Sequence, residues 1–180
     1  RLRLENSAIK FYVGDVRDRD SVDDVMAGVD YVFHAAALKQ VPTCEFFPMQ
    51  ATQTNVVGSQ NIINSAISHG VSKVISLSTD KAVYPVNALG ITKALMEKVV
   101  QSTSRKLSQG QTILSLVRYG NVLFSRGSVI PLFLKQIREK KPITVTEYEM
   151  TRFLLPLKEA IQLVGFALQN GRQGDIFVCN

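Results

Sequence analysis

Short apolar runs alternate with longer segments of helical periodicity along most of this chain. The runs are mainly apolar or β-branched and lie at residues 31–37, 74–77 and 112–117. Such runs are typical of strands that are buried on both faces of a parallel sheet. The segments 50–69 and 88–107 repeat apolar side chains at helical spacing, and a glycine follows each of them within three residues. The alternation therefore predicts an α/β fold with a doubly wound parallel sheet.

Both ends of the chain add further elements to this core. Residues 9–13 predict a short strand, and a helix is expected to begin near Ser21 and to end at Gly28. In the C-terminal third, the pattern predicts helices at 129–139 and 157–169 and strands at 143–146 and 175–178. We expect residues 1–117 to form the ligand-binding sheet domain. Residues 118–180 are expected to form mostly a smaller lobe across the ligand edge of the sheet, with segments that return to the sheet.

Composition excludes several classes of protein. Hydrophobic residues make up 46% of the 180 residues, which indicates a globular chain. Cys44 and Cys179 lie far apart in the sequence, so we do not expect a disulfide framework. We expect a reducing, cytoplasmic location instead. No apolar run reaches membrane-spanning length, and no signal-peptide pattern opens the chain. The first residues do not form an initiator sequence, and we expect the chain to be a fragment.

The net charge of +6 bears on the kind of partner. Lysines and arginines are scattered along the chain, whereas a nucleic-acid binder concentrates them on one face. We therefore expect no nucleic-acid site. A modest basic excess also suits a small anionic substrate.

The clearest candidate site lies where the strand at 74–77 ends. Ser78, Thr79, Asp80 and Lys81 follow that strand directly, and ligands of parallel α/β sheets bind at the carboxyl ends of strands. Asp80 and Lys81 are a candidate acid and base over one bound molecule. The alternative is a solvated loop in which Asp80 caps a helix.

Two other residues remain open to two interpretations. Lys93 is a candidate neighbour of Lys81, or else it forms an ion pair with Glu97 four residues later. His34 lies inside a buried run, which favours a hydrogen-bonded core residue over a catalyst. The chain holds only two histidines and two cysteines, and they are not grouped at ligand spacing, so no metal site is expected.

Several longer motifs carry a family resemblance that covers almost the whole chain. They are Gly-Asp-Val-Arg-Asp at 14–18, His-Ala-Ala-Ala-Leu-Lys-Gln-Val-Pro at 34–42, Asn-Val-Val-Gly at 55–58, Ser-Thr-Asp-Lys at 78–81 and Arg-Tyr-Gly-Asn-Val at 118–122. The chain resembles the extended short-chain dehydrogenase/reductases that modify nucleotide sugars. Within these, residues 78–93 resemble the UDP-N-acetylglucosamine 4,6-dehydratases and 5-epimerases of capsule and O-antigen synthesis. The resemblance implies a Rossmann-like domain over 1–117.

The resemblance also implies roles for individual residues. Catalysis would involve Thr79, Asp80, Lys81, Tyr84 and Lys93. A nicotinamide cofactor, with NADP favoured over NAD, would contact Asp15, Val16, Ala35, Ala36, Ala37, Asn55, Lys93 and Tyr119. A UDP-sugar such as UDP-N-acetylglucosamine would contact Lys39, Asn121, Arg126, Ser128, Val129 and Arg152, the arginines through the diphosphate. The implied reaction oxidises C4, removes the C5 proton through Lys81 while Asp80 protonates the departing C6 hydroxyl, and returns the hydride to C6.

Two departures from the family pattern matter. The glycine-rich turn that follows the first strand of such folds is absent from this sequence, so we expect the chain alone to bind cofactor weakly or not at all. The superfamily motif Tyr-x-x-x-Lys has Leu89 in place of its tyrosine. Tyr84 or Lys81 is our hypothesis for the base that replaces it.

Two other functions remain in view. A UDP-sugar 4-epimerase uses the same fold, although it needs no acid at C6. A non-catalytic nucleotide-binding module fits Leu89 and the absent glycine-rich turn. The resemblance further implies a homo-oligomer for the full-length protein.

Overall fold

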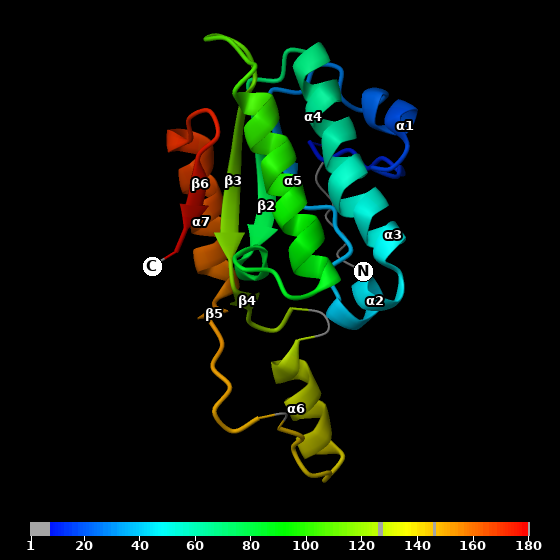
Figure 1. Cartoon of the computed structure of the whole chain (residues 1–180), viewed down its shortest axis with the longest axis vertical. Helices are drawn as coiled ribbons and strands as arrows, with labels where there is room; N and C mark the ends of the chain where they lie inside the picture. The colour runs from blue at the N-terminus through cyan, green and yellow to red at the C-terminus, as the bar shows by residue number, and fades with distance from the viewer. Residues whose placement is uncertain (1–7, 126–127, 146, 180) are drawn as a thin grey trace.

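Four parallel strands form the centre of the molecule, in a computed structural model that describes residues 8–125, 128–145 and 147–179. Their order in the sheet is β1-β2-β3-β6. The strands are β1 (Tyr31–His34), β2 (Lys73–Thr79), β3 (Ile113–Tyr119) and β6 (Ile176–Val178). Helices α4 (Gly58–Ser68) and α5 (Ala88–Ser104) cover one face, and α7 (Leu157–Asn170) covers the other (Figure 1). The predicted doubly wound parallel α/β fold is confirmed.

Side chains that alternate along β2 and β3 build a core on each face of the sheet. Val74 and Leu114 belong to the cluster under α4 and α5, where Met96 and Val100 are fully buried. The neighbouring residues on the strands pack against α7 in a second cluster that contains Ile75, Val117 and Ala167. The two central strands are therefore apolar on both sides, as the sequence predicts for a sheet covered by two helical layers.

The predicted helix at 50–69 is continuous but not uniform. It consists of α3 (Pro48–Thr52), the π-helical turn η1 (Gln53–Val57) and α4. Gly70 follows with φ +69°, a backbone conformation that glycine adopts without the penalty of a Cβ atom. The chain then reverses into β2.

Three predicted elements differ in the structure. Residues 9–13 do not form a strand: no strand among the described residues lies beside them, and the side chains of Phe11 and Val13 are exposed. A strand needs a neighbour for its backbone groups, which the apolar pattern by itself does not supply. Residues 143–145 are likewise not a strand, and 146 lies outside the described residues. Helix α1 (Arg19–Asp23) begins before Ser21, because Asp18 caps it by accepting from the Asp20 amide.

Strand β1 is buried on one side only. It is an edge strand, and Tyr31 and Phe33 are half exposed. The sequence predicts burial on both faces, because an apolar run does not reveal which strand lies at the edge of a sheet.

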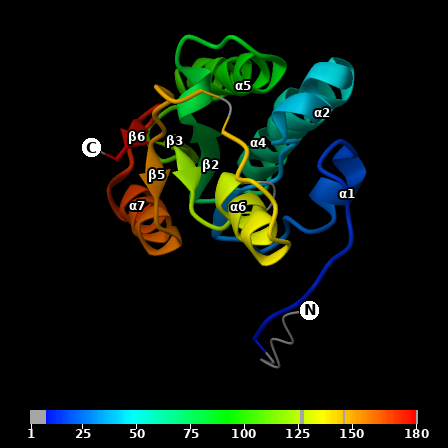
Figure 2. The same cartoon turned by 90° about the horizontal axis from the view of Figure 1, so that it is seen from below.

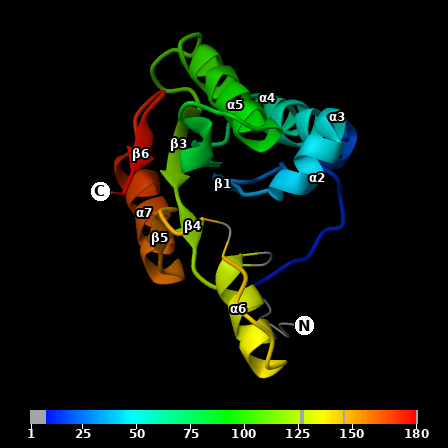
Figure 3. The ribbon, with the colours of Figure 1, turned by 60° about the horizontal axis from the view of Figure 1, so that its bottom comes forward.

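The segments that frame the site lie at the carboxyl ends of the strands (Figure 2). They are α2 (Val41–Phe46), the 3-10 turn η2 (Asp80–Ala82), and the two-residue parallel pair β4 (Asn121–Val122) and β5 (Leu154–Leu155). Helix α6 (Val129–Arg138) projects beyond them and has no buried residue (Figure 3). Within the described ranges, no helix combines the length and hydropathy that a membrane span requires.

Candidate active site

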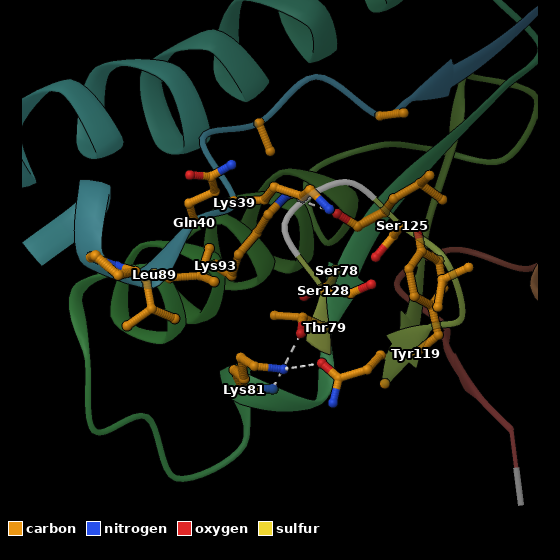
Figure 4. Close-up of a pocket in the computed structure, with 18 residues that line it drawn as sticks. Lys39, Gln40, Ser78, Thr79, Lys81, Leu89, Lys93, Tyr119, Ser125 and Ser128 are labelled. Carbon is orange, nitrogen blue, oxygen red and sulfur yellow. Dashed lines mark hydrogen bonds between the residues drawn. The ribbon is translucent and has the colours of Figure 1, made fainter. Parts of the chain in front are cut away.

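A cavity of about 570 Å³ opens at the carboxyl ends of β1, β2 and β3. Its walls come from the segment after β1, from the end of β2 with η2, from the first two turns of α5, and from the segment after β3 (Figure 4). Nine of the predicted site residues line it: Ala35, Ala37, Lys39, Thr79, Lys81, Lys93, Tyr119, Asn121 and Ser128. The topology thus joins side chains that the sequence separates by more than 90 positions.

The turn after β2 orders the candidate acid and base. The Thr79 hydroxyl caps η2 by accepting from the Lys81 amide and donates to Asp80 Oδ1 over 2.8 Å. The Lys81 ammonium donates to the same Asp80 oxygen over 3.1 Å and to Asn121 Oδ1 over 3.2 Å. Lys81 lines the cavity, whereas Asp80 is not among the residues that line it. The two groups are therefore directly hydrogen-bonded.

Lys93 enters the cavity from α5. It is 6% exposed, and its ammonium donates to the Leu77 carbonyl over 2.9 Å and contacts Met96 Sδ at 3.7 Å. Burial lowers the pKa of Lys93 to about 8, although the Glu97 carboxylate opposes that shift. An ammonium has three donors, so at least one remains for a bound molecule.

Glu97 does not pair with Lys93, which answers the alternative left open by the sequence. Its ion-pair partner is Arg118, with Arg118 Nη2 2.5 Å from Glu97 Oε2. The two side chains come from α5 and β3, and 21 positions separate them. Neither the residues nor their spacing predicts this contact, because it depends on how α5 crosses the sheet.

The candidate cofactor residues divide into two groups. Ala35 and Ala37 line the cavity, where methyl side chains leave room for close approach. Asn55 holds the segment in place, because it bonds both the amide and the carbonyl of Leu38 and donates to Thr92 Oγ1. Ala36 does not line the cavity.

Asp15 and Val16 lie outside the cavity. The Asp15 carboxylate forms an exposed ion pair with Arg17, which lowers the pKa of Asp15 to about 2. Val16 packs against Gly58 so closely that any larger residue at position 58 would collide with it.

The candidate substrate residues are also divided. Lys39, Asn121 and Ser128 line the cavity. Val129 begins α6, and Arg152 is exposed, donating to the neighbouring Thr151 carbonyl. Arg126 lies outside the described residues.

Tyr84 and Leu89 occupy contrasting places. Tyr84 has φ +47°, is 93% exposed and does not line the cavity. Leu89 does line it, while packing against Cys44 and Ala51. The structure therefore brings Lys81, and not Tyr84, together with the other candidate residues.

His34 is a hydrogen-bonded core residue, as the sequence favoured. Its Nε2 lies 2.7 Å from Ser59 Oγ, and burial together with the Lys93 charge lowers the pKa of His34 to about 4. Among the described residues, no group of three or more histidine, cysteine, aspartate or glutamate side chains is arranged to hold a metal ion.

Sequence reasoning missed part of the cavity wall. The missed residues are Gln40, Val41, Pro42, Leu77, Gly120, Val122 and Ser125. Most of them are direct sequence neighbours of predicted residues, so adjacency to the motifs was the available signal.

Comparison with known proteins identifies the family. A family described as "Polysaccharide biosynthesis protein" matches residues 2–180. The chain belongs to this family. The resemblance stated from the motifs is confirmed at the level of a polysaccharide-biosynthesis family, and the dehydratase branch within it stays a prediction.

Curated relatives and a solved structure are similar to this chain over almost its whole length. Proteins named UDP-glucose 4-epimerase from Rickettsia prowazekii and Rickettsia felis are 61% and 60% identical over 178 residues, which is 99% of this chain and 52% of each relative. The chain therefore spans about half the length of these relatives. The X-ray structure of Pen from Bacillus thuringiensis superposes with a TM-score of 0.94 at 41% identity, covering 98% of this chain and 56% of that one.

A more distant structure shows the fold alone. It is the dTDP-glucose 4,6-dehydratase DesIV from Streptomyces venezuelae, with NAD bound, which has a TM-score of 0.87 at 22% identity. The match covers 96% of this chain and 58% of DesIV.

Proposed function

We propose that a protein of the relatives' length that contains this chain is a nucleotide-sugar 4,6-dehydratase with C5 epimerisation. UDP-N-acetylglucosamine is the proposed substrate, and capsule or O-antigen synthesis the proposed context. The observation that carries the proposal is the Lys81–Asp80 hydrogen bond at the cavity, with Asn121 on the other side of the ammonium. Dehydration needs a base at C5 and an acid at C6, whereas C4 epimerisation needs neither.

The cavity residues fit a nicotinamide cofactor. Ala35 and Ala37 offer small side chains, and Lys93 has a spare donor for ribose hydroxyls. When bound, such a cofactor would accept a hydride from C4 and return it to C6. NADP is preferred over NAD in this proposal on the family resemblance.

Lys81 and Asp80 divide the proton chemistry between them. Oxidation at C4 acidifies the C5 hydrogen, and Lys81 removes that proton in its neutral form. Asp80, which shares a hydrogen bond with Lys81, protonates the C6 hydroxyl as it leaves as water. Neutral Lys81 first takes the C4 hydroxyl proton and passes it along this bond to the Asp80 carboxylate, so Lys81 is neutral again when it removes the C5 proton and Asp80 is protonated when the C6 hydroxyl leaves. C5 regains a proton as the hydride returns to C6, so the two protons removed at C4 and C5 balance the one lost in water and the one returned to C5.

The C4 hydroxyl also needs a proton acceptor, because Leu89 stands in place of the usual tyrosine. Lys81 lines the cavity and Tyr84 does not, which supports Lys81 as that acceptor. The homo-oligomer and the cytoplasmic location remain predictions from the sequence.

A 4-epimerase is the second candidate function, favoured by the names of the 61% and 60% identical relatives. Product mass separates the two. We expect incubation with UDP-N-acetylglucosamine and NADP⁺ in D₂O to give a product lighter by one water, with deuterium at C5. An unchanged mass with inverted C4 would establish epimerisation instead.

Single substitutions at Lys81 and Tyr84 test which side chain acts as the base. Lys81→Met should lower kcat at least about a hundredfold, because it removes the base. The exposed-lysine variant Lys106→Met is the matched control and should retain activity. Tyr84→Phe should also retain activity, and a loss comparable to that of Lys81→Met would make Tyr84 the acceptor at C4. If the protein converts no UDP-sugar but still binds one, the non-catalytic module is the correct function.

A further inference from the structure

A buried carboxylate lies behind the cavity, one helical turn beyond Lys93. Glu97 is 3% exposed and uses both oxygens. Oε1 accepts from Ser78 Oγ over 2.6 Å and from Arg118 Nε over 2.8 Å, and Oε2 accepts from Arg118 Nη2 over 2.5 Å. The Arg118–Glu97 pair is therefore bidentate, the strongest geometry for an arginine and a carboxylate.

The three partners come from three different elements. Ser78 and Arg118 are paired residues in the register of β2 and β3, and Glu97 reaches both of them from α5. Each is close in sequence to a cavity residue. Ser78 precedes Thr79, Arg118 precedes Tyr119, and Glu97 follows Lys93 by one turn. The cluster thus joins the three backbone segments that carry Thr79, Lys93 and Tyr119, which are candidate site residues.

The arrangement is costly unless every group is satisfied. Removing a carboxylate from water is energetically costly, and only good hydrogen-bonding geometry offsets that cost. The cluster meets that condition, with three hydrogen bonds on one carboxylate. Arg118 also keeps Glu97 from turning to Lys93, whose ammonium remains directed at Leu77 and the cavity.

Other charged and titratable groups line the cavity with Lys93 or lie on the elements around it. They are His34 from β1, Lys39 from the segment before α2, Asp80 and Lys81 from η2, and Arg118 and Tyr119 from β3. Together with Glu97, this set contains two carboxylates, those of Asp80 and Glu97. Asp80 is bound to Lys81, which leaves Glu97 as the carboxylate on the helix of Lys93 itself.

We propose that Glu97 is a positioning residue for Lys93: anchored by Arg118 and Ser78, it fixes α5 against the ends of β2 and β3 and stabilises the charged ammonium in the cavity. The effect of this positioning on turnover rests on the proposed dehydration. The effect of Glu97 on the titration of Lys93 does not rest on it, and the two effects are measured separately.

The direct test is the titration of Lys93, followed by NMR of lysine labelled with ¹³C at Cε and assigned with Lys93→Met. In Glu97→Gln the opposing carboxylate is gone, so the pKa of Lys93 should fall further below about 8. Glu159→Gln, an exposed glutamate on α7, makes the same chemical change away from the site and should leave the Lys93 titration unchanged. An unchanged titration in Glu97→Gln overturns the proposal, whatever the enzyme activity.

Arg118→Met covers the case in which Glu97→Gln does not fold. Removal of the guanidinium frees the Glu97 carboxylate, so the pKa of Lys93 should rise. No rise would overturn the proposal.

The kinetic arm uses Glu97→Asp, which keeps the charge but shortens the reach. We expect kcat to fall about ten- to a hundredfold through misplacement of α5, with the Lys93 titration closer to that of the unmodified protein than in Glu97→Gln. A lower melting temperature with unchanged kcat would show a purely structural role and overturn the proposal. If the titrations shift as expected but no product lighter by water forms, the proposed dehydration fails and the positioning of Lys93 stands.

Discussion

The two histidines of the chain occupy opposite environments, and one of them makes stability depend on pH. His34 is buried with a pKa of about 4, below the ordinary value of 6.5, so the folded state binds its proton less readily than the unfolded state. The stability that the neutral ring preserves is fully present above about pH 6.5 and is lost as the pH falls toward 4. The loss should reach about 3 kcal/mol.

Urea unfolding at pH 7 and pH 4.5 measures this effect. His34→Gln should remove most of the histidine-dependent part of the difference, because the amide does not titrate. His69→Gln should keep it, since His69 is only partly buried and lies at the end of α4. If the unfolding free energy changed equally between pH 7 and pH 4.5 in the two variants, the assignment to His34 would be contradicted.

At the scale of elements, the site depends on how closely α5 approaches the turn after β2. Asn87 caps α5 by accepting from the Gly90 amide over 2.9 Å. A Cβ atom at Gly90 would collide with the Lys81 carbonyl and crowd Pro85. Glycine therefore lets the first turn of α5 lie directly against the backbone that carries Lys81.

Gly90→Ala should separate α5 from η2 and move Lys81 relative to Lys93. We expect destabilisation by more than about 1 kcal/mol, although alanine is by itself the better helix former by about that amount. Activity should fall more than stability explains. Gly165→Ala on α7 has open space at its Cβ and should be neutral or stabilising. Thermal unfolding with kcat at one permissive temperature distinguishes the two, and similar behaviour would refute the close approach.

At the scale of the molecule, the C-terminal third is part of the sheet domain as well as of the site. Strand β6 pairs with β3, and α7 buries Ala167 against Ile75 and Val117. The division into residues 1–117 and 118–180 stays a prediction, but α7 and β6 belong physically to the first part.

Ala167→Glu tests this dependence. A carboxylate forced between α7 and the sheet would lie against the apolar side chains of Ile75 and Val117, and we expect the protein to lose more than about 3 kcal/mol of unfolding free energy. Ile161→Glu places the same charge on the exposed side of α7 and should change it by less than about 0.5 kcal/mol. Loss of the near-UV circular dichroism signal with urea measures both. A small effect of Ala167→Glu would mean that α7 is not needed to cover the sheet.

The sequence predicted the central strands and helices well, but it predicted the peripheral strands poorly. Strands β2 and β3 were predictable because burial on both faces leaves a nearly continuous apolar run, and α4 ends where Gly70 takes a positive φ. Residues 9–13 and 143–145 carry the same local pattern without becoming strands. Pairing is a contact between distant segments, and a local pattern does not contain it.

The features of the site likewise divide into those that follow from local sequence and those that depend on contacts between distant segments. By itself, the sequence determined the parallel α/β fold and the adjacency of Thr79, Asp80 and Lys81, because strand periodicity and neighbouring positions are local properties. Only the tertiary structure decided that Lys81 meets Asn121, that Tyr84 does not line the cavity, and that Glu97 pairs with Arg118 instead of Lys93. These outcomes depend on the angle and depth at which α5 and the loops pack on the sheet, which are set by side chains from several distant segments at once.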